Sequence, residues 1–174
     1  MDALRSSGAS YALIGGFAVA YHGLPRPTRD IDLLVSVPRV RLPGVLEAFR
    51  DRGFTFDPDA VLRELGEDHL SSIRYASVRV DLLDAVIPFF RRTVASAINA
   101  EVHGHEVRIA RGEDLIVLKM IAGREDDLRD VKGILAVEGG SLDVDDIRRS
   151  LAECCDRTRM ETFERLVVES ASGG

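Results

Sequence analysis

The stretch from Asp30 to Val37, "DIDLLVSV", joins two acidic side chains to an almost wholly apolar run. Side chains of a β-strand alternate between its two faces, so Asp30 and Asp32 share one face, with Cα atoms roughly 6–7 Å apart. The apolar residues that follow are typical of a strand in the middle of a sheet. Two carboxylates at the head of such a strand repel each other unless something positive lies between them. This pair therefore constrains both the fold and the chemistry around it.

Strands and helices are expected to alternate over the first 110 residues. Strands are predicted at 11–14, 31–37, 69–75 and 77–84, with a tight turn between the last two, and a hairpin at 100–110 turns at Gly104. Helices are predicted at 17–22, 38–53, 57–68 and 88–97. Pro43 marks the regular start of the second helix, and Asp57 caps the third. The stripe expected to be buried in the second helix consists of Val40, Val45, Leu46 and Phe49.

The character of the sequence changes after Arg111. Four helical segments follow, at 112–123, 124–139, 143–156 and 157–170, with no strand expected between them. We therefore expect an α/β (α+β) fold with a mixed β-sheet flanked by helices. Its domains are a core at 1–110 that carries the chemistry and a helical region at 111–174 packed on that core.

Composition excludes several classes of protein. The 174 residues include 23 basic and 29 acidic side chains, a net charge of −6, so no global basic field recruits nucleic acid. No apolar run approaches the ~20 residues of a membrane helix, and the first ten residues lack the apolar core of a signal peptide. A cytoplasmic protein without a membrane partner is expected.

Asp81 is a third carboxylate in a strand of apolar β-formers. If its strand lies beside that of Asp32, three carboxylates meet at one edge of the sheet, and hard oxygen ligands of this kind select Mg²⁺ or Mn²⁺. In the simpler interpretation, Asp30 caps a turn, Asp32 faces solvent on an edge strand and Asp81 pairs with a nearby arginine. Gly15 and Gly16 favour the metal site, because glycines between a strand and a helix let backbone N–H groups approach a polyanion.

These residues resemble the nucleotidyltransferase superfamily of the DNA polymerase β type. The matching pattern is Gly15-Gly16, a short helix, Arg26-x-Thr28-x-Asp30-x-Asp32, and Asp81 on a later strand. Within the superfamily, the sequence is similar to the small bacterial nucleotidyltransferases of the AbiEii toxin group. The resemblance covers about residues 10 to 135 and implies a nucleotidyltransferase-like mixed sheet.

The resemblance implies a role for each of these positions. Asp30, Asp32 and Asp81 are the expected catalytic and metal-binding residues, holding Mg²⁺ or Mn²⁺ on an NTP co-substrate. Asp81 is also expected to accept the proton of the attacking hydroxyl. The nucleotide-binding residues are expected to be Gly15, Gly16, Arg26, Thr28 and Lys119. An NMP would pass to a hydroxyl acceptor, and pyrophosphate would leave.

A second matching stretch is "EDLIVLKMIAGREDDLRDV". Relatives carry a lysine on a helix, then an arginine and two aspartates three residues apart, and Lys119, Arg124, Asp127 and Asp130 fill these places. Lys119 either reaches the triphosphate or is a solvated residue of an amphipathic helix. Arg124, Asp127 and Asp130 are expected to support the lysine helix through ion pairs.

The acceptor stays open among three classes: RNA, most plausibly a tRNA end; a protein hydroxyl; and a small hydroxylated molecule. With RNA as acceptor, the protein would be the toxin of a toxin–antitoxin pair, and a cognate antitoxin would be its partner. The alternative function is a catalytically inactive binding or regulatory module that keeps the fold. Asp126, where relatives often carry a basic residue, favours this alternative, whereas the intact set of three carboxylates argues against it.

Overall fold

The structure is a computed structural model that describes residues 4, 7–23, 25, 27–102 and 104–172 of the chain. Arg26, expected to bind nucleotide, lies outside the described residues. By its internal contacts the chain forms two compact units, residues 1–17 with 27–110 and residues 18–26 with 111–174. The division predicted from the sequence differs at residues 18–26, which it places in the core at 1–110.

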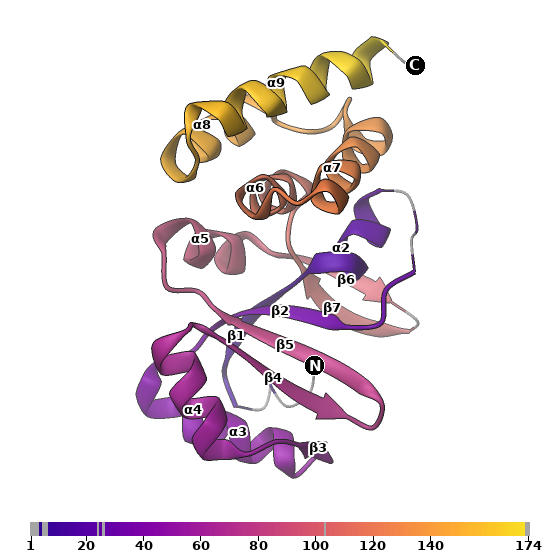
Figure 1. Ribbon diagram of the computed structural model, residues 1–174. Helices are drawn as coiled ribbons and strands as arrows, with labels where there is room; N and C mark the ends of the chain where they lie inside the picture. The colour runs from indigo at the N-terminus through magenta and orange to yellow at the C-terminus, as the bar shows by residue number, and fades with distance from the viewer. Residues whose placement is uncertain (1–3, 5–6, 24, 26, 103, 173–174) are drawn as a thin grey trace. The chain divides into compact units, whose positions relative to one another are not determined.

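The first unit contains the β-sheet and the helices connected to it (Figure 1). Its strands are β1 (Ser10–Ile14), β2 (Ile31–Ser36), β3 (Phe54–Thr55), β4 (Leu70–Tyr75), β5 (Val78–Asp84), β6 (Ile98–Val102) and β7 (His105–Ile109). Its helices are the 3₁₀ turn η1 (Arg39–Arg41), α3 (Leu42–Arg50), α4 (Pro58–Glu67) and α5 (Pro88–Ser96). Helix α2 (Gly15–His22) begins in this unit and ends in the other.

The described strands form one mixed sheet in the order β3-β4-β5-β2-β1-β7-β6. Strand β2 pairs in parallel with β5 and antiparallel with β1, so it lies in the middle of the sheet. Its Leu33, Leu34 and Val35 are buried. The prediction of a central strand is confirmed, and the suggestion that Asp32 lies on an edge strand is wrong.

Strands β4 and β5 form a hairpin with only two residues, Ala76 and Ser77, between them. Ala76 has φ +50°, the left-handed backbone conformation that tight hairpin turns require. In this register Ser72 lies opposite Asp81, and Arg74 lies opposite Arg79. The turn therefore sets which residues of β4 face the carboxylate of β5.

The helix predicted at 38–53 differs from the structure. A single 3₁₀ turn precedes α3, and Val40 within that turn is 87% exposed, so its assignment to the buried stripe is wrong. The helical periodicity begins only at Leu42, which is buried together with Val45, Leu46 and Phe49. Strand β3 was not predicted, because two residues are too few to show an alternating pattern.

The second unit contains four C-terminal helices, coloured orange to yellow in Figure 1. They are α6 (Gly112–Ala122), α7 (Glu125–Glu138), α8 (Val144–Cys154) and α9 (Arg157–Ser172). Helix α6 is buried through most of its length and contacts the other three helices. No helix in the described part of the chain has the length and apolar character needed to cross a membrane.

Candidate active site

The three predicted carboxylates lie in the first unit, around the paired strands β2 and β5. Asp32 is the register partner of Asp81, and Asp30 lies just before β2 begins. Directly paired residues of neighbouring strands project from the same face of a sheet, so Asp32 and Asp81 lie side by side. The expectation that the two acidic strands are neighbours is confirmed.

The backbone of Gly15 passes very close to the Asp32 carboxylate. Ile14, the last residue of β1, pairs with Asp32, and α2 begins at Gly15 with φ +63°. A Cβ atom on Gly15 would overlap the Asp32 side chain, and a Cβ atom on Gly16 would lie 2.5 Å from Thr28 Oγ1. Only glycine leaves space for this approach and adopts this backbone conformation without strain. The helix start, Asp32 and Thr28 therefore form one close cluster.

Thr28 and Asp30 flank the approach to β2. The Thr28 hydroxyl donates a hydrogen bond to the backbone carbonyl of Asp30 at 3.4 Å. Both residues lie on the connector between α2 and β2, and the Asp30 side chain is exposed. The connector thus places Thr28 beside Gly16 and Asp30 beside the first residue of the strand.

Arg79 is the positive group at this cluster, and sequence reasoning did not single it out. Its Nε donates to Asp81 Oδ1 at 2.7 Å and to Ser72 Oγ at 3.2 Å, and its Nη2 donates to Ser72 Oγ at 3.0 Å. Ser72 Oγ in turn donates to Asp81 Oδ1 at 2.6 Å. The Asp81 oxygen therefore accepts two short hydrogen bonds. The arginine partner in the simpler interpretation of Asp81 is confirmed.

All three carboxylates act on the Arg79 guanidinium. The hydrogen bond to Asp81 contributes most to raising the pKa of Arg79, followed by the charge of Asp81, and the charges of Asp30 and Asp32 add to it. Arg79 is therefore a positive charge bound to Asp81 and felt by the carboxylate pair at the head of β2. Arg79 lies two residues before Asp81, so the two side chains share one face of β5, and this spacing could have indicated their contact from the sequence.

The chemical type of the donors, carboxylate oxygen, suits a hard divalent cation. Carboxylate oxygens are the ligands that Mg²⁺ and Mn²⁺ prefer, and Asp32 and Asp81 project side by side with Asp30 adjacent in sequence. The close approach of Gly15 to Asp32 brings the start of a helix to the same place. Among the described residues, no three or more acidic, histidine or cysteine side chains form a group that could hold a metal ion.

The lysine motif forms a buried ion-pair network in the second unit. Lys119 of α6 is 7% exposed, and its Nζ lies 2.9 Å from Asp127 Oδ1 and 2.8 Å from Asp130 Oδ2, both on α7. Arg124 Nε donates to Asp127 Oδ2 at 2.7 Å. The alternative of a solvated Lys119 is wrong. The network joins α6 to α7, the supporting arrangement expected for Arg124, Asp127 and Asp130.

The Asp127 carboxyl responds to both cations. Burial acts to raise its pKa, but the hydrogen bonds from Arg124 and Lys119 outweigh burial and hold the pKa below its usual value. Asp127 also accepts a bond from the backbone N–H of Arg124, so it closes the start of α7. One carboxylate thus caps a helix and neutralises a buried ammonium.

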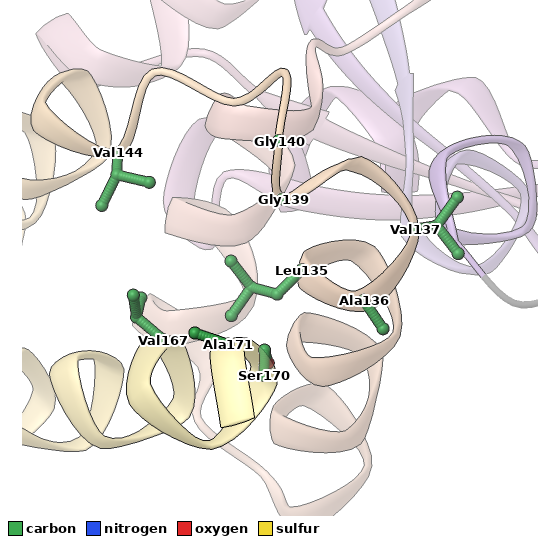
Figure 2. A pocket seen from close by; sticks show the side chains of 9 residues that line it. All are labelled: Leu135, Ala136, Val137, Gly139, Gly140, Val144, Val167, Ser170 and Ala171. Carbon is green, nitrogen blue, oxygen red and sulfur yellow. The ribbon is translucent and has the colours of Figure 1, made fainter. Parts of the chain in front are cut away.

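The second unit also contains a shallow apolar hollow of about 370 Å³ between the end of α7 and α9. Figure 2 shows Leu135 of α7 facing Val167 and Ala171 of α9. The Ser170 hydroxyl at its rim donates to the Leu166 carbonyl of its own helix. The lining residues include no titratable or nucleophilic group beyond this hydroxyl, so the hollow does not compete with the carboxylate cluster as a site of chemistry.

The solved structures with a similar fold include one that is described as nucleotidyltransferase-like. An antigenic nucleotidyltransferase-like protein from Paracoccidioides brasiliensis matches with a TM-score of 0.52 and 15% identity over 87% of this chain and 82% of that chain. ANT(2")-Ia in complex with adenylyl-2"-tobramycin matches with a TM-score of 0.47 and 17% identity over 98% and 92% of the two chains. The first likeness shows a nucleotidyltransferase fold. No curated protein matches this sequence.

The chain belongs to the family described as "Nucleotidyl transferase of unknown function (DUF2204)", whose model matches residues 1–167. It is therefore an enzyme of the nucleotidyltransferase class, as the sequence resemblance implied. The narrower resemblance to the AbiEii toxin group stays a prediction.

Proposed function

We propose that this protein is a Mg²⁺- or Mn²⁺-dependent nucleotidyltransferase that moves an NMP from an NTP to a hydroxyl acceptor and releases pyrophosphate. The observation that carries the proposal is the pairing of Asp32 with Asp81 in neighbouring parallel strands, beside Asp30 and the glycine start of α2. Membership of a nucleotidyltransferase family supports the reaction class. Chemistry of this kind rests on positioning and charge neutralisation rather than on covalent catalysis by the protein.

Asp30, Asp32 and Asp81 would hold the metal, which supplies positive charge to the phosphates when bound. Gly15 and Gly16 are the first two residues of α2, and the N–H groups of a first helical turn have no partner within the helix, so a polyanion is favoured there. We propose that Asp81 accepts the proton of the attacking hydroxyl and that Thr28 binds the nucleotide. These roles are proposals for the positions that the resemblance assigned.

Lys119 has a different role in this proposal. Its ammonium lies between two buried carboxylates at 2.9 and 2.8 Å, and such a group is committed to its partners. We propose that Lys119 positions α6 against α7, together with Arg124, Asp127 and Asp130. The nucleotide-binding role of Arg26 remains a proposal from the sequence.

Thermal unfolding of the purified protein with each of the four NTPs, with and without Mg²⁺, tests the metal–nucleotide site. A ligand that binds only the native state raises the melting temperature, so we expect a rise only when one NTP and metal are both present. Asp32→Asn should remove the rise. The exposed Asp51→Asn, the same chemical change outside the cluster, should keep it. A rise without metal, or an equal rise in Asp32→Asn, contradicts the proposal.

The acceptor is then sought with the NTP found, labelled on its α-phosphate. RNA, a protein and a small polyhydroxylated molecule are offered separately, and label on one of them identifies the class. We propose the toxin role, with an antitoxin partner, only together with RNA as the acceptor. Metal–nucleotide binding without transfer to any acceptor class would favour the inactive binding module.

A further inference from the structure

The guanidinium of Arg79 is a positive charge in contact with the carboxylate cluster. Its Nε lies 2.7 Å from Asp81 Oδ1, and the same oxygen accepts the Ser72 hydroxyl at 2.6 Å. A carboxylate oxygen has about two lone-pair directions. With two short donors on Oδ1, this oxygen has no favourable direction left for a further cation, so a cation on Asp81 would bind Oδ2, close to the guanidinium, or take the place of Arg79 on Oδ1.

The guanidinium and a divalent cation also compete through charge. Arg79 is bound to Asp81, and Asp32 lies beside Asp81 in the sheet, so a metal held by these two carboxylates would lie close to the guanidinium. A divalent ion brought among them would meet a like charge a few ångströms away, and like charges near a protein surface repel by the same law that attracts opposite ones. Repulsion between the two cations therefore weakens metal binding for as long as the guanidinium stays on Asp81.

The Arg79 side chain is exposed enough to move away from Asp81. Its side chain is 46% exposed, whereas that of Asp81 is 19% exposed. Its second contact, to Ser72, lies on the neighbouring strand of the same hairpin. A long exposed side chain can rotate into solvent at little cost, because surface ion pairs contribute little net free energy. The contact with Asp81 is therefore exchangeable.

We propose that Arg79 is an internal counter-ion of the Asp30, Asp32 and Asp81 carboxylates, and that a divalent cation binds by displacing its guanidinium from Asp81. The inference rests on the proposed function, because it takes these carboxylates as the metal-binding group. Arg79 is then a positioning residue: it keeps the metal-free cluster stable and aims Asp81, and it lowers the affinity for metal. Metal binding and release of the arginine are one coupled event.

The test measures Mn²⁺ binding to the whole protein by calorimetry, without nucleotide, for the wild type and Arg79→Gln. Loss of the competing charge should tighten Mn²⁺ binding roughly fivefold, the order expected from partly exposed charge interactions. The metal-free melting temperature of Arg79→Gln should be lower than that of the wild type, and its rise on adding Mn²⁺ larger. If Arg79 were merely structural, Arg79→Gln would lower the melting temperature without tightening Mn²⁺ binding.

Arg74→Gln is the matched control. Arg74 is the cross-strand partner of Arg79, is exposed, and has the same charge, so its loss changes the general field by a similar amount. We expect it to change Mn²⁺ affinity less than Arg79→Gln does. Equal tightening in both variants, or unchanged or weaker binding in Arg79→Gln, overturns the inference. If Arg79→Gln does not fold, Arg79→Lys, which keeps the charge but loses the paired nitrogen contacts with Ser72, should bind Mn²⁺ more tightly than the wild type, and unchanged or weaker binding would overturn the inference.

Failure of the proposed function gives a different pattern. If the wild type and Arg79→Gln both bind no Mn²⁺, or if Asp32→Asn binds it as well as the wild type, the metal site itself is wrong and the inference falls with it. If the wild type binds Mn²⁺ and Asp32→Asn does not, the site stands, and the Arg79 variants alone decide the inference.

Discussion

Gly15 occupies a position where both the backbone and the available space exclude other residues. Its φ of +63° is costly for any residue with a Cβ atom, and that atom would overlap the Asp32 carboxylate. We predict that Gly15→Ala loses about 2 kcal/mol of unfolding free energy and loses Mn²⁺ binding. Urea unfolding and calorimetry measure the two effects.

Gly44→Ala is the control for that change. Gly44 lies in α3 with nothing within 4 Å of the added Cβ atom. Alanine in a helix is favoured over glycine by about 0.5–1 kcal/mol, so this variant should be as stable as the wild type or slightly more so. If Gly15→Ala behaves like Gly44→Ala, the proposed approach of α2 to Asp32 is wrong.

Lys119 forms ion pairs with two carboxylates that have little contact with water. Asp127 and Asp130 are 1% and 5% exposed. Lys119→Met leaves these acids without their shared cation, and removal of one partner from a buried ion pair typically costs about 3–5 kcal/mol. The same substitution at Lys132, half-exposed beside Glu169, should cost less than about 1 kcal/mol. Chemical denaturation of both variants makes the comparison, and similar losses would mean that Lys119 is not the centre of the network.

The carboxylates of the site were predictable because an acid in an apolar strand is conspicuous. Asp30, Asp32 and Asp81 each interrupt or precede such a run, and the sheet brings their strands together. Arg79 was not singled out, because an arginine that alternates with valines is the usual outward-facing residue of a strand. Its contact with Ser72 depends on the register of two strands, which composition does not reveal.

At the scale of elements, helix α4 is stabilised by Asp57, the residue directly before its first turn. The Asp57 carboxylate accepts hydrogen bonds from the backbone N–H groups of Asp59 at 3.0 Å and Ala60 at 3.5 Å. These two hydrogen bonds confirm the predicted cap. The cap could be predicted because an aspartate directly before a proline is a local signal of a helix start. Asp57→Ala should cost about 1 kcal/mol of unfolding free energy.

Asp68→Ala, at the other end of α4, provides the comparison. An acid near a helix C-terminus interacts unfavourably with the helix dipole, so removing it should leave stability unchanged or slightly higher. Thermal and urea unfolding of the two variants would separate the ends of the helix. Equal losses from Asp57→Ala and Asp68→Ala would argue against capping.

Elements were harder to predict where they are short. The 3₁₀ turn at Arg39–Arg41 continues directly into α3, so the sequence looks like one longer helix, and the apolar Val40 fits its periodicity. A single turn buries little, and the valine points to solvent. Longer elements with a full apolar face, such as α3 itself and β2, were recognisable from period alone.

For the whole molecule, the ion pairs predict how stability depends on pH. The pKa of Asp127 is held below its usual value in the fold. A carboxyl of this kind stabilises the native state above its unfolded pKa, and the contribution is lost as the pH falls through the lower folded value. We therefore expect the unfolding free energy to decrease as the pH drops below about 4.

Urea unfolding between pH 3 and pH 7 measures this slope. Asp127→Asn should be less stable at pH 7 and should show a flatter decline in acid. Asp126→Asn changes the exposed neighbour of Asp127 and should decline like the wild type. An unchanged slope in Asp127→Asn would show that other groups govern the acid response.

The two-residue turn between β4 and β5 has a consequence for how this family can vary. The register of a hairpin follows from the length of its loop, and a shift of one residue moves every side chain to the opposite face. One residue inserted at Ala76 would move Ser72 out of register with Asp81, whereas Asp81 would stay beside Asp32 through the pairing of β5 with β2. An insertion here would therefore take the Ser72 hydroxyl away from both Asp81 and Arg79, so lineages that keep this contact should inherit the turn as a fixed spacing.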